Sequence, residues 1–110
     1  MMPSEIQFVD ERVEKAFREL KDGDSEEREL HRWLLRAFED IEKNVFCGVN
    51  VPKKLVPRVY IQKYGIRNLW KYDLPRGWRL MYSIVGNKAI VVSIILEWLP
   101  HKEYERRFRY

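Results

Sequence analysis

The sequence has little of what disulfide frameworks, structural zinc sites and membrane spans require. Its one cysteine, Cys47, excludes an internal disulfide and a multi-cysteine zinc site. Its longest apolar run, Ala89 to Leu96, is eight residues long, whereas a helix needs about 20 residues to cross a bilayer. The N-terminus lacks the charged-then-apolar order of a signal peptide. We therefore expect a soluble, cytoplasmic protein with no membrane partner.

Signals for cofactors and for common catalytic motifs are also missing. The chain contains no glycine-rich phosphate loop, no dinucleotide-binding fingerprint and no serine nucleophile elbow. No spacing of histidines and carboxylates indicates a metal site. We therefore expect a protein that uses neither a metal nor a cofactor.

Enough apolar sequence is present for one folded unit. The 110 residues are 45% hydrophobic, which supports a single domain over 1–110 and excludes general disorder. Charged residues reach 35%, a share typical of a heat-adapted (thermophile) source. Residues 1–50 hold 8 Lys/Arg and 13 Asp/Glu, a net of −5, while residues 51–110 hold 13 and 4, a net of +9. The basic second half suits a polyanionic partner, and equally suits a soluble domain whose halves simply differ.

The first half predicts a strand followed by a helical hairpin. Glu5 to Val9 alternates polar and apolar side chains as a strand does. A helix follows from Asp10, its N-cap, to Leu20. A second helix, with Asp24 at its N-cap, spans about Ser25 to about Phe46, and Gly48 is its natural stop. The short link between the two amphipathic helices indicates an antiparallel pair.

The second half predicts a β-meander. A proline-containing loop over 49–57 leads into a short helix that ends at Tyr64. Alternation predicts strands over 68–74 and 78–85, and the apolar run 89–96 predicts a covered central strand after a Gly86-Asn87 turn. His101 to Phe108 forms a last short helix. This order predicts an α+β fold: an N-terminal strand and an α-helical hairpin packed on one face of an antiparallel β-meander, with a short C-terminal helix.

A turn at 75–77 would fix a register that separates two faces of the meander. Asp73 then lies opposite Arg79, and Lys71 lies opposite Met81. One face collects six large side chains, namely Trp70, Tyr72, Leu74, Trp78, Leu80 and Tyr82. The other face collects Lys71, Asp73 and Arg79. We expect the helical hairpin to cover the first face and the second to remain open.

Two interpretations of Arg79 follow from this register. A cross-strand ion pair with Asp73 would be an ordinary feature worth ~0.2–1 kcal/mol. Alternatively, the planar guanidinium suits the oxygens of a phosphate group. Both hold together if Asp73 only orients the guanidinium.

Other reactive side chains fit structural roles better. His31 has no chemical partner nearby in the second helix, so we expect it on the surface. Cys47, at a helix end, is expected to be a small buried filler. Trp70, Trp78 and Tyr82 share the apolar face, which favours core positions over base stacking.

The run Gly77-Trp78-Arg79-Leu80-Met81-Tyr82-Ser83-Ile84 resembles the central strand of the RelE/ParE superfamily of toxins. That signature is a small residue, an aromatic, an arginine, an aliphatic pair and a tyrosine. The helical hairpin before the sheet and the segment Pro100-His101-Lys102-Glu103-Tyr104 after it are also similar to the family. The resemblance implies a RelE-like fold and a toxin that a cognate antitoxin neutralises. RelE-type members cut mRNA in the ribosomal A site, whereas ParE-type members poison gyrase.

In the RNA-cutting type, basic side chains help the ribose 2′-hydroxyl to attack the adjacent phosphate. By motif, the resemblance implies that Arg79 stabilises the phosphate and that Lys71 supplies a second cation. His101 and Tyr104 fall near the C-terminal acid–base positions. An imidazole suits a general acid because it changes charge between about pH 5 and 8. His101 could equally cap the last helix, and Tyr104 could equally pack it on the sheet.

Further basic residues are candidates for RNA contact, namely Lys53, Lys54, Arg76, Arg106 and Arg107. In the tail, basic and aromatic groups alternate as they do in RNA-contacting segments, although a solvated terminus explains this as well. The two lysines could equally serve only to solubilise their loop.

The chain departs from the RNA-cutting pattern at two positions. Asp73 stands where a second lysine is frequent, and Leu99 stands where a basic residue is frequent. The leading hypothesis is a metal-independent, ribosome-dependent mRNA endonuclease whose partners are mRNA on the ribosome and an antitoxin. The two missing cations favour the alternative, a non-cleaving ParE-like or degenerate member that acts as a protein-binding module. A domain whose sheet binds only a partner helix is the third possibility.

Overall fold

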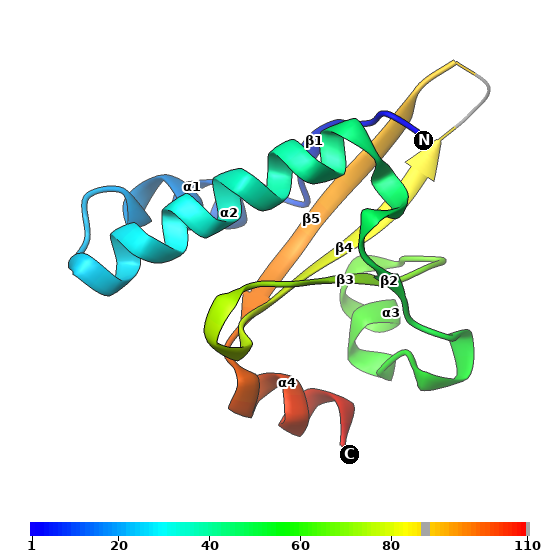
Figure 1. The fold of residues 1–110 in the computed structure, drawn as a ribbon. Coiled ribbons are helices and arrows are strands. Elements are labelled where there is room, and N and C mark those ends of the chain that lie inside the picture. Colours follow the sequence, from blue (N-terminus) through cyan, green and yellow to red (C-terminus); the bar gives the residue numbers. More distant parts are fainter. Residues whose placement is uncertain (87–88, 110) are drawn as a thin grey trace.

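The computed structural model describes residues 1–86 and 89–109. Its centre is a five-stranded sheet in the order β1-β5-β4-β3-β2 (Figure 1). The strands are β1 (Glu5–Phe8), β2 (Val49–Asn50), β3 (Trp70–Asp73), β4 (Arg79–Gly86) and β5 (Val91–Leu99). β1 runs parallel to β5, whereas the other neighbours are antiparallel. The fold is therefore α+β, as predicted, with a mixed sheet.

The N-terminal strand corrects the prediction. It does not pack on a face of the meander, because its backbone pairs with β5 from Glu5↔Val92 to Phe8↔Ile95. A strand needs hydrogen-bond partners for its peptide groups, and the free edge of β5 provides them. The N-terminal strand thus widens the sheet.

Two capped helices cover one face of the sheet. α1 (Glu11–Leu20) begins at Asp10, whose side chain accepts a hydrogen bond from Val13 N at 2.9 Å. α2 (Ser25–Lys43) begins with a capping box between Asp24 and Glu27. Their apolar stripes pack on β-strand side chains to form the first core, in which Leu34, Ala37, Ile41, Leu80, Tyr82 and Ile95 are fully buried. No helix in the described residues is long and apolar enough to span a membrane.

The predicted hairpin register is confirmed. β3 pairs with β4 as Trp70↔Tyr82, Lys71↔Met81, Tyr72↔Leu80 and Asp73↔Arg79. The turn that sets it places Arg76 and Gly77 at positive φ angles of 56° and 80°. Glycine reaches that region without a steric penalty, which makes the tight connection possible.

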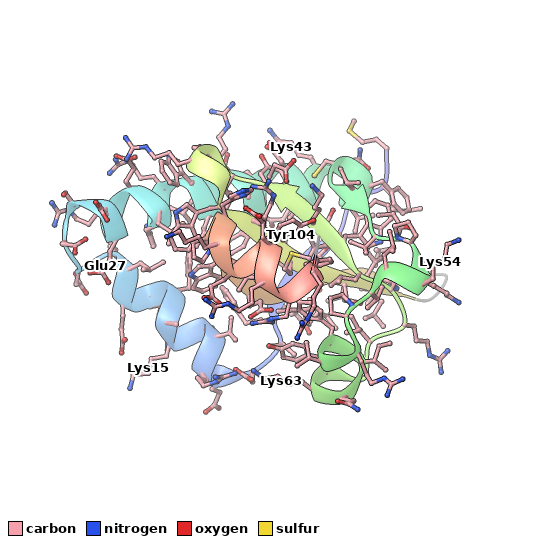
Figure 2. All side chains as sticks on the ribbon, turned by 90° about the horizontal axis from the view of Figure 1, so that it is seen from below. Lys15, Glu27, Lys43, Lys54, Lys63 and Tyr104 are labelled. Carbon is pink, nitrogen blue, oxygen red and sulfur yellow. The ribbon has the colours of Figure 1, made fainter. Side chains whose placement is uncertain are left out.

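The expectation of an open second face is wrong. α3 (Arg58–Tyr64) and α4 (His101–Phe108) cover much of it, on the side of the sheet opposite α1 and α2 (Figures 1 and 2). They enclose a second core made of Val51, Tyr60, Leu69, Met81, Leu96, Leu99 and Tyr104. The physical reason is that Tyr104 and Phe108, one turn apart, give α4 an apolar side that has to be buried.

A β-bulge in β5 distributes its side chains over both faces. Met81 pairs with Glu97 while Tyr82 pairs with Ile95, so Leu96 is the extra residue. The bulge places Leu96 in the second core, and Trp98 packs against the first. Glu97 lies opposite Met81, on the face that α3 and α4 cover.

Several predicted boundaries differ from the structure. α2 ends at Lys43 and a separate 3-10 turn spans Val45–Cys47, because the Asn44 side chain accepts a hydrogen bond from Phe46 N. Gly48 has an extended backbone instead of a left-handed one. The last strand covers Val91–Leu99, which is later than 89–96, and Asn87 of the expected turn lies outside the described residues. Cys47 is exposed, which contradicts the expectation of a buried filler.

Candidate functional site

Two cations and one carboxylate meet on the α4 side of the β3–β4 hairpin. Arg79 Nε lies 3.0 Å and Lys71 Nζ lies 3.3 Å from the same oxygen, Asp73 Oδ1. The Tyr104 ring of α4 lies below both, 5.0 Å from the guanidinium carbon and 5.5 Å from the ammonium nitrogen. We call these four residues the Arg79 cluster. The aromatic face and the carboxylate both stabilise the two positive charges.

Arg79 is held in a fixed position by more than Asp73. Its Nη1 donates to the Gly77 carbonyl at 2.6 Å and lies 3.3 Å from the Trp78 carbonyl. Nε is buried and lies within ion-pair distance of Asp73, but the angle between the two groups does not allow a hydrogen bond. The side chain is 17% exposed. The Arg79 guanidinium is therefore rigidly held and largely enclosed.

His101 lies close to the same turn. It is the first residue of α4, and a Cβ placed on Gly77 would come within 2.9 Å of His101 Cβ and 3.7 Å of Nδ1. Its Nε2 contacts the Glu105 carboxylate one turn later, and the side chain is 55% exposed. Arg79 and His101 thus both lie next to Gly77, and the imidazole is half-exposed.

Tyr104 is part of the core. Its side chain packs against Phe108 at 4.5 Å between ring centroids, and only 3% of the residue is exposed. This burial agrees with the alternative in which the tyrosine packs the last helix on the sheet. It supports the cations from beneath.

The other predicted RNA contacts are dispersed. Arg107 pairs with Glu97 at 2.6 Å, Arg106 pairs with Glu103 at 3.1 Å, and Arg76 lies 4.0 Å from Glu29 of α2. Lys53 and Lys54 are exposed in a 3-10 turn, and Figure 2 shows Lys54 at the margin of the molecule while Tyr104 is near the centre. The structure therefore brings together Arg79, Lys71, His101 and Tyr104, but not the five candidates for RNA contact.

Sequence reasoning missed Glu97, a partly buried carboxylate at the border of the second core. Arg107 pairs with it, and the Arg107 guanidinium lies 5.5 Å from the Tyr60 ring. Burial and then the proximity of Glu97 raise the pKa of Tyr60 far above its usual value. A single acidic residue in an otherwise apolar strand was the available signal, because such a residue needs a cationic partner.

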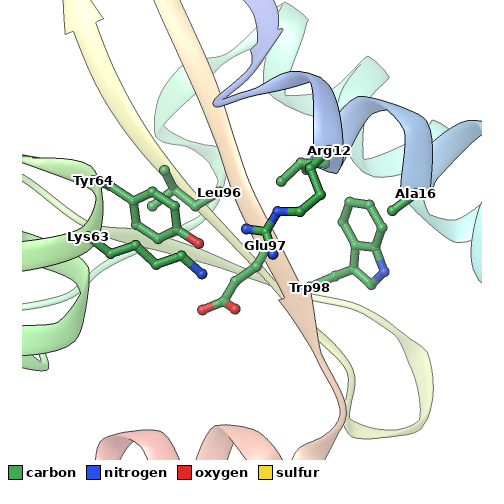
Figure 3. Close-up of a pocket in the computed structure, with 8 residues that line it drawn as sticks. Arg12, Ala16, Lys63, Tyr64, Leu96, Glu97 and Trp98 are labelled. Carbon is green, nitrogen blue, oxygen red and sulfur yellow. The ribbon is translucent and has the colours of Figure 1, made fainter.

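A depression borders this network between α1 and α3. It has a volume of about 230 Å³ and is lined by Arg12, Val13, Ala16, Lys63, Tyr64, Leu96, Glu97 and Trp98. Figure 3 shows Arg12 reaching across β5 towards Glu97, with Tyr64 and Trp98 on opposite sides. Its volume is below the usual range for small-molecule pockets.

The remaining side chains named from sequence have structural surroundings. The His31 ring stacks on Phe17 at 4.6 Å between centroids, so it joins the two helices of the hairpin. Trp70 and Trp78 pack against the first core, as expected. Within residues 1–86 and 89–109, no group of three or more His, Cys, Asp or Glu side chains could hold a metal ion.

The chain matches no protein-family model, no curated protein and no solved structure.

Proposed function

We propose that this chain is a RelE-like toxin, a metal-independent endonuclease that cuts mRNA on the ribosome and is neutralised by a cognate antitoxin in the cytoplasm. The observation that carries the proposal is the pairing of Arg79 and Lys71 with one oxygen of Asp73, with His101 next to Gly77, whose carbonyl accepts a hydrogen bond from Arg79. Groups with complementary acid–base and electrostatic roles that meet at an accessible point indicate a reaction site.

The proposed roles are those that the family resemblance implies for these residues. Arg79 and Lys71, which both pair with Asp73 in the free protein, bind the phosphate together and supply two positive charges to it. The 2′-hydroxyl gives its proton to a water molecule of the solvent as its oxygen attacks the phosphorus, and negative charge builds on the phosphate oxygens beside these cations. His101 then donates a proton to the departing 5′-oxygen. The products are a 2′,3′-cyclic phosphate and a 5′-hydroxyl, and neither requires a metal ion.

The proposal is tested by producing the wild-type chain in bacteria without an antitoxin. We expect growth to stop and mRNA ends to map within codons, with a cyclic phosphate on the upstream fragment. A chain with Arg79→Gln, made to the same level, is the control. Normal growth and intact mRNA in both cultures would contradict the proposal.

Asp73 supports the second candidate function, a non-cleaving ParE-like or degenerate binding module. Its carboxylate pairs with both cations of the site, and Leu99, where a basic residue is frequent, is buried in the second core. Growth arrest with intact mRNA would favour this alternative over cleavage.

Replacing Asp73 with asparagine separates the two candidates. Arg79 keeps its two carbonyl partners in this variant, so the guanidinium stays in place while its ion pair is lost. An endonuclease should then bind RNA ~3–10-fold more tightly, because about 1 kcal/mol of competing attraction is removed. RNA affinity is measured by fluorescence anisotropy and cleavage in a translation extract. Asp22→Asn, in an exposed turn of the acidic half, is the matched control.

A further inference from the structure

A second pocket lies between α2 and β3, on the opposite side of the β3 edge from the Arg79 cluster. Its lining comes from α2 and from the end of β3 with the following turn, namely Arg32, Trp33, Arg36, Tyr72, Asp73, Leu74 and Pro75. Its volume is about 460 Å³, which is within the ~300–1,000 Å³ of typical ligand pockets. We call it the α2–β3 pocket.

The aromatic walls of the pocket are held in fixed positions. The Tyr72 hydroxyl donates to Asp40 Oδ2 at 2.5 Å, and both Tyr72 and Trp33 pack against the first core. Burial and then Asp40 raise the pKa of Tyr72, so the phenol stays neutral at cellular pH. Rigid, half-buried aromatic rings provide stacking surfaces at low entropic cost.

The pocket also carries positive charge that its own surroundings do not neutralise. Arg32 and Arg76 lie 4.0 Å from the same Glu29, which is a long distance for an ion pair. Arg36 is exposed, and no described carboxylate lies within ion-pair distance of it. Lys71 and Arg79 of the Arg79 cluster bring the number of cations in this region to five. The carboxylates of the region are Glu29, Asp40 and Asp73, so its net charge is positive.

One residue connects the pocket to the Arg79 cluster. Asp73 lines the pocket and also pairs with Arg79 at 3.0 Å. On the β3 edge that faces away from β4, β2 pairs only with Trp70 and Lys71, and no other strand in the described part of the chain covers that edge at Tyr72 and Asp73. A polymer that crosses this uncovered edge can reach both sites at once.

We propose that the α2–β3 pocket holds the base of a single-stranded RNA nucleotide next to the phosphate bound by Arg79, by stacking with Trp33 and by contact of Arg36 with the backbone. This inference rests on the proposed function and adds a substrate subsite to it. Unpaired bases stack on aromatic and guanidinium planes, which a paired base cannot do. The pocket combines both kinds of surface with a lining residue, Asp73, that also pairs with Arg79.

The test measures binding of an RNA that cannot be cut. An end-labelled, single-stranded RNA with 2′-O-methyl groups on every ribose lacks the attacking hydroxyl, so anisotropy reports affinity alone. Arg36→Gln should weaken binding ~5–10-fold and lower the slope of log affinity against log salt by about 0.7, the value for one lost contact to a single strand. Trp33→Leu should weaken binding ~5–100-fold, as expected for one lost stacked base.

Arg18→Gln is the matched control, because Arg18 is an exposed arginine of α1 that pairs only with Glu14 in the described residues. It should leave the affinity and the salt slope nearly unchanged. The salt slope also distinguishes a lost contact from unfolding of Arg36→Gln. A partly unfolded sample would bind less RNA, but the dependence of its affinity on salt would not fall by the amount expected for one lost charge.

The outcomes separate this inference from the proposed function. Weaker binding in both pocket variants with a normal control supports the pocket, even if the wild-type chain cuts no RNA. Equal affinity of wild type, Arg36→Gln and Trp33→Leu overturns the pocket, even if Arg79→Gln abolishes cleavage. Absence of any RNA binding by the wild type also overturns it.

Discussion

Replacing Arg79 with glutamine is expected to lower ribosome-dependent mRNA cleavage by ~10²–10³-fold, the usual effect of removing one positioned donor to a developing negative charge. Glutamine retains hydrogen-bonding capacity but not the positive charge. The cleavage rate is measured in a reconstituted translation system under single-turnover conditions. The comparison isolates the transition-state contribution of the guanidinium.

Arg79 also contributes to the structure, so stability has to be measured in parallel. The side chain pairs with a half-exposed Asp73 and bonds to two carbonyls of its own turn. We expect Arg79→Gln to lose about 1 kcal/mol of unfolding free energy in urea, which leaves it folded. Arg58→Gln, at an exposed position of α3, is the charge-matched control. Cleavage by folded Arg79→Gln at the wild-type rate would remove Arg79 from the reaction.

The protein is expected to lose stability steeply as the pH rises above about 10, because of its buried tyrosines. Tyr60 and Tyr82 are fully buried. Burial is the largest cause of the raised pKa of both, followed by Glu97 for Tyr60 and by Cys47 for Tyr82. An unfolded chain releases tyrosine protons near pH ~10, whereas the folded chain retains them. This contribution is complete below pH ~10 and is lost as the pH rises towards the folded-state pKa values.

Each fully buried tyrosine contributes ~1.4 kcal/mol per pH unit in that range, so the two together contribute ~2.8 kcal/mol per unit. Tyr72 shifts in the same direction. The measurement is a series of urea unfolding curves at increasing pH. Tyr60→Phe is the most informative variant, because the Tyr60 hydroxyl is buried with no hydrogen-bond partner among the described residues.

Tyr60→Phe should therefore keep or gain stability at neutral pH, by up to ~1–3 kcal/mol. It should also reduce the alkaline slope by the share of one tyrosine. Deprotonation of lysines affects both proteins alike, so the difference between their slopes isolates Tyr60. Identical slopes for wild type and Tyr60→Phe would show that Tyr60 does not control alkaline unfolding.

The sequence predicted the hairpin correctly because turn geometry and face alternation are both local. A turn at 75–77 and the alternation of Trp70, Tyr72 and Leu74 were sufficient to pair Asp73 with Arg79. The N-caps at Asp10 and Asp24 are equally local, since each acts within one helical turn.

The predictions failed where distant segments meet. α3 and α4 are short, and their burial depends on Tyr60 and Tyr104 finding the same side of the sheet across more than 40 residues of chain. The bulge at Leu96 also changes the alternation in β5, which hides the position of Glu97 from a period-2 reading. For the site, the sequence left two interpretations of Arg79 open, and its pairing with Asp73 was one of them. The α2–β3 pocket could not be predicted, because its walls come from segments that meet only in the tertiary fold.

Asp73 has a consequence for how this surface responds to ionic strength. Its carboxylate occupies the position between Arg79 and Lys71 that an arriving phosphate would take. When RNA binds, its phosphate would then replace the Asp73 carboxylate beside the two cations. Fewer salt ions are therefore released from the protein and the RNA than the number of cations in the contact suggests. A count of charged contacts from salt titration alone would therefore be too low for this protein, and Asp73→Asn would restore the missing increment.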